Sequence, residues 1–236
     1  MVEGDLFREV NEELRRERLK QLWDRFGSWV LTGAAVIVAV VGGYKYWQYW
    51  TAQQSAAAGA RYVAALSLVE DGQQAEALEA FKAMAADAPA GYRLLAHLQM
   101  AGLAVKEDRI DDALAIYDAI VGDRGADQLL RDYATVQSAM LRVDKEDWTK
   151  IKNRLNQLIG AESPWRFSAR EIVGLAAYRA GKMDEAERLF NDILSEPGVP
   201  TGVRQRANVM LALIIGAGAW AKAGSKAKAE AAEKTN

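Results

Sequence analysis

Residues 107–120 read EDRIDDALAIYDAI, and two other stretches repeat their pattern: DGQQAEALEAFKAM at residues 71–84 and AGKMDEAERLFNDI at residues 180–193. We align the three stretches on Gly72, Asp108 and Gly181, which we predict to be equivalent turns. Each stretch then has a small residue five positions after the turn, an aromatic residue nine positions after it and a large apolar residue twelve positions after it. These residues are Ala77, Phe81 and Met84; Ala113, Tyr117 and Ile120; and Ala186, Phe190 and Ile193.

The shared spacing predicts a helix whose apolar face packs closely against a second helix. The three positions lie on one face because an α-helix has about 3.6 residues per turn. The alanine lets two helices approach, and the aromatic ring fills the space beside it. Another small residue stands seven positions before each turn, namely Ala65, Ala101 and Gly174, which predicts a preceding helix that touches the first one there.

The distances between the turns predict a fourth helix pair. The first two turns are 36 residues apart and the last two are 73 apart, about twice that period. The sequence DKEDWTKIKNRLNQLIG, residues 144–160, occupies the gap. With Glu146 as its turn, it matches the pattern only loosely, through Ile151, Leu155 and Leu158, and Ala139 takes the small position of the preceding helix.

These residues resemble the tetratricopeptide repeat, a pair of antiparallel helices of about 34 residues that stacks into a superhelix. Pro89 also stands where that family ends its second helix. The family's signature tryptophan is missing, because Arg61, His97 and Arg170 occupy its positions, so the copies are divergent. We therefore predict an all-α fold with an α-solenoid of about four divergent helix pairs; an ordinary helical bundle is the alternative.

An apolar segment precedes the repeats. Residues 26–44 are 19 uncharged residues between Arg25 and Lys45, which is long enough as a helix to cross a hydrocarbon layer of about 30 Å. We predict a single N-terminal transmembrane helix that runs on into the first helix of the repeats. A buried helix of a soluble core is the alternative. Cleavage as a signal peptide is disfavoured because the nearest small-x-small triplet, residues 56–58, lies too far downstream.

Aromatic and basic residues around this segment predict its orientation. Aromatic side chains that favour the membrane interface stand at both ends: Trp23, Trp29, Tyr44, Tyr46, Trp47 and Trp50. Basic residues are concentrated before the segment, which predicts a cytoplasmic N-terminus. We expect residues 1–25 to form an amphipathic cytoplasmic segment at the lipid surface, residues 45–220 a periplasmic repeat domain, and residues 221–236 a disordered tail. The first segment could equally be a solvated leader.

Composition argues against several classes of function. The formal net charge of −2 makes a nucleic-acid partner a poor candidate, and the absence of cysteine removes disulfides and thiolate metal sites. A single histidine, His97, lies in a predicted packed helix. The acids Asp111, Asp112, Asp184 and Glu185 fall in first turns of predicted helices, where the helix dipole favours negative charge. We therefore predict no enzyme activity, no cofactor and no small-molecule substrate, with an envelope hydrolase as a remote alternative.

Helical-repeat stacks bind proteins or peptides on a concave face that is lined mainly by the first helix of each pair. By this resemblance, the residues expected to face a partner are Tyr62, Gln99, Lys106, Tyr178 and Arg179. An ordinary solvated or partly packed helix face is the alternative for these positions.

Anchor and repeats together resemble the YfgM-like ancillary subunits of the SecYEG translocon, with the Tyr46-Trp47 pair just outside the span. The resemblance covers most of the chain. It implies a membrane-tethered periplasmic scaffold at the bacterial inner membrane, without enzyme activity, whose partners are membrane lipid, the translocon, periplasmic chaperones and exported proteins. A scaffold for cell-envelope assembly or division is the alternative.

Overall fold

The structure is a computed structural model that describes the backbone of residues 3–216 and the side chains of residues 25, 29 and 31–216. All secondary structure in this range is helical, which confirms the predicted all-α class. The chain divides into two compact units, Met1–Gly59 and Ala60–Asn236. One long helix, α1 (Glu3–Glu70), begins in the first unit and ends in the second, as expected for an apolar segment that continues into the repeats.

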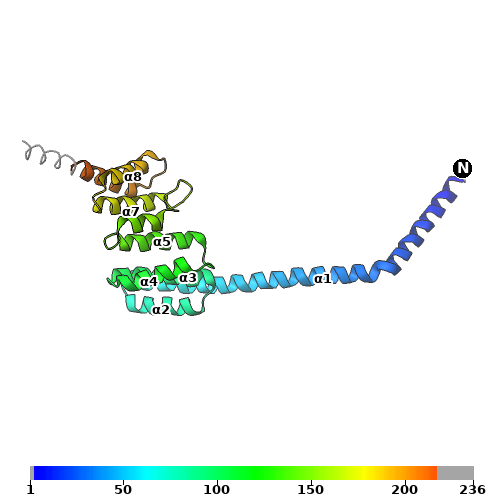
Figure 1. Cartoon of the computed structure of the whole chain (residues 1–236). Coiled ribbons are helices and arrows are strands. Elements are labelled where there is room, and N and C mark those ends of the chain that lie inside the picture. Colours follow the sequence, from blue (N-terminus) through cyan, green and yellow to red (C-terminus); the bar gives the residue numbers. More distant parts are fainter. Residues whose placement is uncertain (1–2, 217–236) are drawn as a thin grey trace, which may run out of the picture. The chain divides into compact units, whose positions relative to one another are not determined.

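The second unit holds the remaining helices (Figure 1). After the end of α1 they are α2 (Gln74–Asp87), α3 (Ala90–Lys106), α4 (Ile110–Gly122), α5 (Gln128–Arg142), α6 (Trp148–Leu155), α7 (Arg166–Arg179) and α8 (Met183–Ser195). A further helix covers residues 201–216. Residues 217–220 of the predicted repeat domain and the predicted tail at 221–236 lie outside the described residues.

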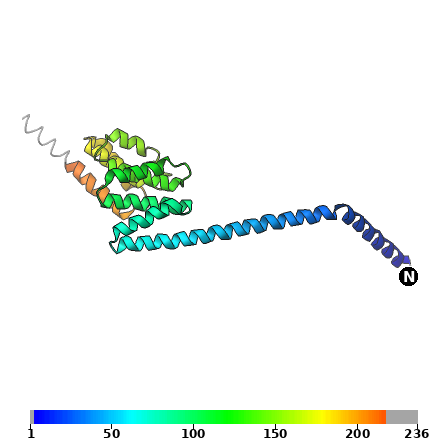
Figure 2. The ribbon, with the colours of Figure 1, turned by 90° about the horizontal axis from the view of Figure 1, so that it is seen from below.

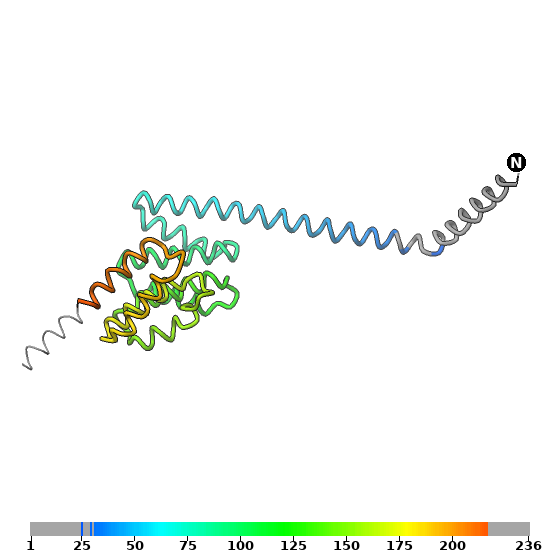
Figure 3. The backbone as a smooth tube through the Cα atoms, turned by 90° about the horizontal axis from the view of Figure 1, so that it is seen from above, coloured from blue at the N-terminus to red at the C-terminus, as the bar shows by residue number. Residues whose placement is uncertain are grey.

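The helices form four successive pairs: the end of α1 with α2, α3 with α4, α5 with α6, and α7 with α8. Consecutive helices pack on one another along the chain, for example α2 on α3, α3 on α4 and α4 on α5. Figures 2 and 3 show the chain reversing direction from each helix to the next. This is the arrangement of an α-solenoid, in which each pair contacts mainly its neighbours.

Three of the four predicted turns have the same unusual backbone. Gly72, Asp108 and Gly181 all have positive φ, at 78°, 59° and 72°. Glycine adopts this left-handed conformation without steric cost, and aspartate is one of the few other residues that tolerates it. Glu146 is not among the residues with positive φ in the described part of the chain, and the helix after it, α6, has only 8 residues. The third pair is therefore the most divergent one.

The residues that define the repeat form the core. Ala77, Phe81, Ala113, Ile151, Leu155, Ala186, Phe190 and Ile193 are completely buried, and the other predicted core positions are at most 6% exposed. Ala65, Ala101, Ala139 and Gly174 are buried at the predicted contact points of the preceding helices. A Cβ atom added to Gly174 would lie 3.0 Å from Cζ of Phe190, so here the two helices touch as the pattern predicted.

The helix at residues 201–216 covers the last pair. Val203, Ala207 and Ile214 are buried against a cluster that includes Phe167 and Phe190. Its Arg206 donates two hydrogen bonds, of 2.5 and 2.8 Å, to the buried carboxylate of Glu171 on α7. This ion pair and the apolar contacts hold the helix against the end of the stack.

The first unit exposes apolar and aromatic side chains along α1. Val36, Ile37, Val38 and Val40 are between 55% and 72% exposed, and so are the predicted interface residues Tyr44, Tyr46 and Trp47. Trp29 is 76% exposed and Trp50 51%, whereas the side chain of Trp23 lies outside the described residues. Among the residues that could be searched, no helix combines the length and apolar character of a membrane span. The predicted span includes residues 26–28 and 30, whose side chains are also outside the described set.

Candidate protein-binding groove

An apolar groove of about 690 Å³ opens where α3, α4 and α5 meet. We call it the α3–α5 groove. One wall is the first half of α3, from Ala90 to His97, and the other is the loop at residues 123–127 with Leu130 of α5. The second half of α4, which packs on both α3 and α5, supplies Ala115, Ile116, Ala119 and Ile120 between the walls.

Small side chains keep this groove open. Ala115 and Ala119 stand four residues apart, so they lie on the same face of α4, and both are exposed. Gly91 on α3 and Gly125 in the loop leave further space. The apolar surface beneath comes from the buried Leu94 and Ile120 and from the partly buried Ile116 and Leu130. The groove can therefore accept large apolar side chains without moving the helices.

Charged groups stand on the two walls of the groove. Arg93, on the α3 wall, is exposed and makes no side-chain hydrogen bond or ion pair with any residue that the structure describes. On the other wall, Asp123 accepts a hydrogen bond of 2.8 Å from the N–H of Gly125, and Asp127 caps α5 by accepting one of 2.8 Å from the N–H of Leu129. The groove thus has a cation on one wall and two carboxylates on the other.

None of the five predicted groove residues lines the α3–α5 groove. The structure brings two of them together, because the side-chain amide of Gln99 donates a hydrogen bond of 2.8 Å to the hydroxyl of Tyr62. The Tyr62 ring also contacts Phe81, with 5.8 Å between the ring centroids. These two residues join the first helix pair to the second, and whether they also meet a partner stays a prediction.

The other three predicted residues lie apart from that pair. Lys106 is exposed at the end of α3. Tyr178 packs against the core of the last pair, and the guanidinium of Arg179 donates to the backbone carbonyl of Asp144 beyond α5. Arg179 therefore connects the third pair to the fourth. Sequence reasoning missed the α3–α5 groove because its outer residues are alanines and glycines that carry no motif.

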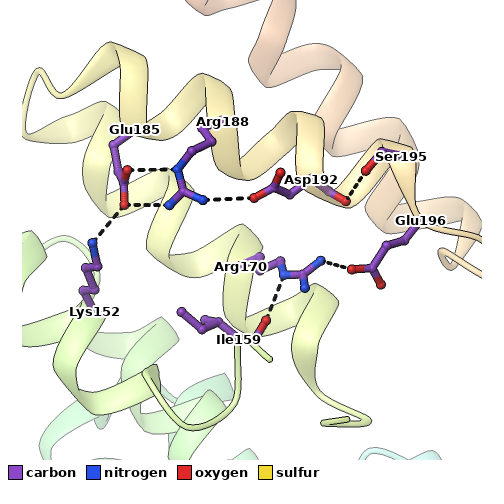
Figure 4. Close-up of polar contacts among 8 residues, drawn as sticks. All are labelled: Lys152, Ile159, Arg170, Glu185, Arg188, Asp192, Ser195 and Glu196. Carbon is purple, nitrogen blue, oxygen red and sulfur yellow. Dashed lines mark hydrogen bonds and ion pairs between the residues drawn. The ribbon is translucent and has the colours of Figure 1, made fainter. Parts of the chain in front are cut away.

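A charged cluster joins α6 to α8 (Figure 4). Glu185 accepts hydrogen bonds from Arg188, at 3.0 and 3.2 Å, and from Lys152 of α6, at 2.9 Å. These bonds, those from Arg188 first, lower the pKa of the Glu185 carboxyl to about 2. The Nζ atom of Lys152 also lies 4.8 Å from the ring centroid of Trp148, and the Nζ atom of Lys182 lies 5.0 Å from the same centroid. The charged groups of this cluster pair with one another, which indicates a structural role.

The acids that could suggest catalysis occupy the predicted positions. Asp111 and Asp112 are in the first turn of α4, and Asp184 and Glu185 are in the first turn of α8. In the part of the chain that the structure describes, no three His, Cys, Asp or Glu residues are grouped so that they could hold a metal ion. His97 lines the α3–α5 groove without such a group around it.

The comparisons with known proteins agree with this architecture. The family described as "Tetratricopeptide repeat-like domain" matches residues 20–199. The chain is also 22% identical over 176 residues to a protein of Haemophilus influenzae named "Ancillary SecYEG translocon subunit"; the match covers 75% of this chain and 84% of that protein. The resemblance inferred from the repeats and the apolar segment is confirmed by these two matches.

Proposed function

The chain belongs to the family of tetratricopeptide repeat-like domains, and on that basis we propose that it is a protein-interaction scaffold associated with a Sec-type translocon. In this role it holds exported proteins, or the chaperones that receive them, and it carries out no reaction itself. The observation that carries the proposal is a stack of four helix pairs with an open apolar groove on its surface. The name of the Haemophilus relative supports the translocon as the neighbouring complex.

We further propose that residues 26–44 cross the bacterial inner membrane, with the N-terminus in the cytoplasm and the repeats in the periplasm. The proposal rests on 19 residues without charge, on the aromatic residues that follow them and on the basic residues that precede them. The exposed valines and isoleucine of α1 would then face lipid instead of water. Residues 1–25 would lie along the cytoplasmic lipid surface.

A tether explains how a weak binding site could serve this function. When the groove and its partner are both held near the same membrane complex, binding of the partner in the groove is effectively intramolecular. The effective concentration of the partner can then reach the mM range. Modest affinity for many different segments is then sufficient. This suits a protein that meets many exported chains as they emerge, and it suits contacts with periplasmic chaperones that exchange clients.

Co-purification from membranes tests the proposal. The full chain, carrying an affinity tag, is extracted with a mild detergent, and the bound proteins are identified by mass spectrometry. We expect translocon subunits together with periplasmic chaperones or exported proteins. A matched control is residues 45–236 exported without the preceding segment, which should lose most of the translocon. Recovery of cell-division or wall-assembly proteins in place of the translocon would contradict the proposal.

A further inference from the structure

We propose that the α3–α5 groove binds an apolar peptide segment that has an acidic residue at its edge on the α3 side and a basic residue on the side of the α4–α5 loop. This names the chemistry of the partner and rests on the proposed function for the partner's origin, a protein that crosses the translocon. The binding itself is a property of the groove and can be tested separately.

The size and the lining of the groove favour an apolar occupant. Its volume of about 690 Å³ lies in the range of about 300–1,000 Å³ that is typical of binding sites. Leu94, Ile116, Ile120 and Leu130 form a continuous apolar surface, and burial of each large apolar side chain against such a surface is favourable. The alanines of α4 leave room for side chains of the size of leucine or phenylalanine.

The charges on the two walls define what must flank the apolar segment. The guanidinium of Arg93 has no carboxylate partner among the described residues, so a partner's Asp or Glu can pair with it without displacing anything. Asp123 and Asp127 each accept one backbone N–H and keep further acceptor capacity for a Lys or Arg. Opposite charges on opposite walls favour one orientation of the segment over its reverse.

The apolar residues 26–44 are assigned to the membrane in the proposed function, and the end of the chain does not provide such a segment either. Residues 217–236, which follow the last described helix, contain one large apolar residue, Trp220, among alanines, glycines and charged residues. One ring cannot supply the several large side chains that the groove accommodates. A separate protein with a run of apolar residues is the occupant that fits.

The first experiment fills the groove. The full chain in detergent micelles is titrated into a fluorescent peptide that has a leucine-rich centre with Glu at one flank and Lys at the other, and binding is read by anisotropy. The variant Ala119→Leu should weaken binding by about tenfold or more, because the added side chain takes the place of a peptide side chain. The control variant Ala83→Leu, at an exposed alanine of α2 outside the groove, should bind like the wild type. Equal binding by all three proteins would overturn the proposal.

The second experiment reverses a charge. Arg93→Glu should weaken binding of the Glu/Lys peptide by about threefold to tenfold, an effect that decreases at high salt because the pair is solvent-exposed. A peptide with Lys in place of Glu should in turn prefer Arg93→Glu to the wild type. The control, Arg204→Glu in the helix at residues 201–216, changes the net charge equally from an exposed site that does not line the groove, and should have little effect. The same loss in both variants would contradict a specific pairing.

Two further readouts separate the possible failures. Thermal unfolding followed by circular dichroism shows whether each variant is folded. Because the substituted positions are exposed, the variants should keep the fold. If the wild-type chain associates with itself in a way that blocks peptide binding, and Ala119→Leu abolishes that self-association, the groove holds a second copy of the chain and the proposal is wrong. If Arg93→Glu loses the peptide but still co-purifies with the translocon, the groove and the membrane association are independent. Peptide binding without any translocon in the co-purification would refute the proposed function and leave the groove proposal intact.

Discussion

Replacement of Gly174 by alanine tests the helix contact that defines the repeat. Gly174 lies on α7 against the ring of Phe190 on α8, and an added Cβ atom would be 3.0 Å from Cζ and 3.1 Å from Cε2 of that ring. Phe190 is completely buried, so the ring has no open space into which it can turn. The alanine therefore forces the ring, or the two helices, to shift by a few tenths of an ångström.

Two opposing effects set the size of the change. Alanine is a better helix former than glycine by about 0.5–1 kcal/mol, which favours the variant. Overpacking of a well-filled core costs about 1–3 kcal/mol, which opposes it. We expect a net loss of about 1 kcal/mol in the free energy of unfolding, because Cζ and Cε2 of the Phe190 ring would both lie closer to the added Cβ atom than ordinary van der Waals distance.

Urea unfolding of the full chain in detergent, followed by circular dichroism, measures this loss. The control is Gly102→Ala on α3, where an added Cβ atom meets nothing within 4 Å, and which should gain about 0.5–1 kcal/mol. In the double variant Gly174→Ala with Phe190→Leu, the clash is relieved, so the alanine should cost less than it does alone. If Gly174→Ala stabilises the chain as much as Gly102→Ala, the close packing of α7 on Phe190 is refuted.

Three other contacts give further expected outcomes. Hydrogen bonds from Arg188 and Lys152 lower the pKa of Glu185 from its ordinary 4.5 to about 2. The wild type should therefore be more stable than Glu185→Gln by the full amount above pH 4.5, and this difference in the free energy of unfolding should disappear as the pH falls towards 2; melting curves across this range measure it. Arg206→Ala leaves the buried Glu171 carboxylate without its partner and should cost about 1–3 kcal/mol, seen as faster amide hydrogen exchange in residues 201–216; unchanged exchange would count against the ion pair. Tyr62→Phe removes the hydrogen bond from Gln99 but keeps the ring, and should cost about 0.5–1.5 kcal/mol in urea unfolding, whereas no change would show that the bond contributes nothing.

The repeat pattern could be predicted from sequence because each of its positions has a local physical cause. Ala113 and Tyr117 are four residues apart on one helix face, and Asp108 marks the turn where the backbone takes a positive φ. Such requirements recur in every pair, so three copies in register identified the buried residues correctly. The third pair was predictable only from the period, because Glu146 replaces the residue with positive φ and α6 is short.

The candidate groove could not be predicted in this way. The groove depends on the separation of α3 and α5 across α4, and on the small size of Ala115, Ala119 and Gly91. A sequence pattern shows which residues are buried, but it does not show where neighbouring helices leave a space. For the same reason, the hydrogen bond between Gln99 and Tyr62 was not foreseen, although both residues were selected for their expected position on one face.

Photo-crosslinking in living cells tests the central claim, that the repeat stack is a surface for proteins in transit. A photoreactive amino acid is placed at Ala119 inside the α3–α5 groove and, as a control, at Ala83 on α2. The account predicts that the Ala119 probe forms adducts with exported proteins or their chaperones, that these adducts fade when protein export is blocked, and that the Ala83 probe forms few of them. Equal adducts from both positions, or adducts at Ala119 with cytoplasmic proteins alone, would contradict it.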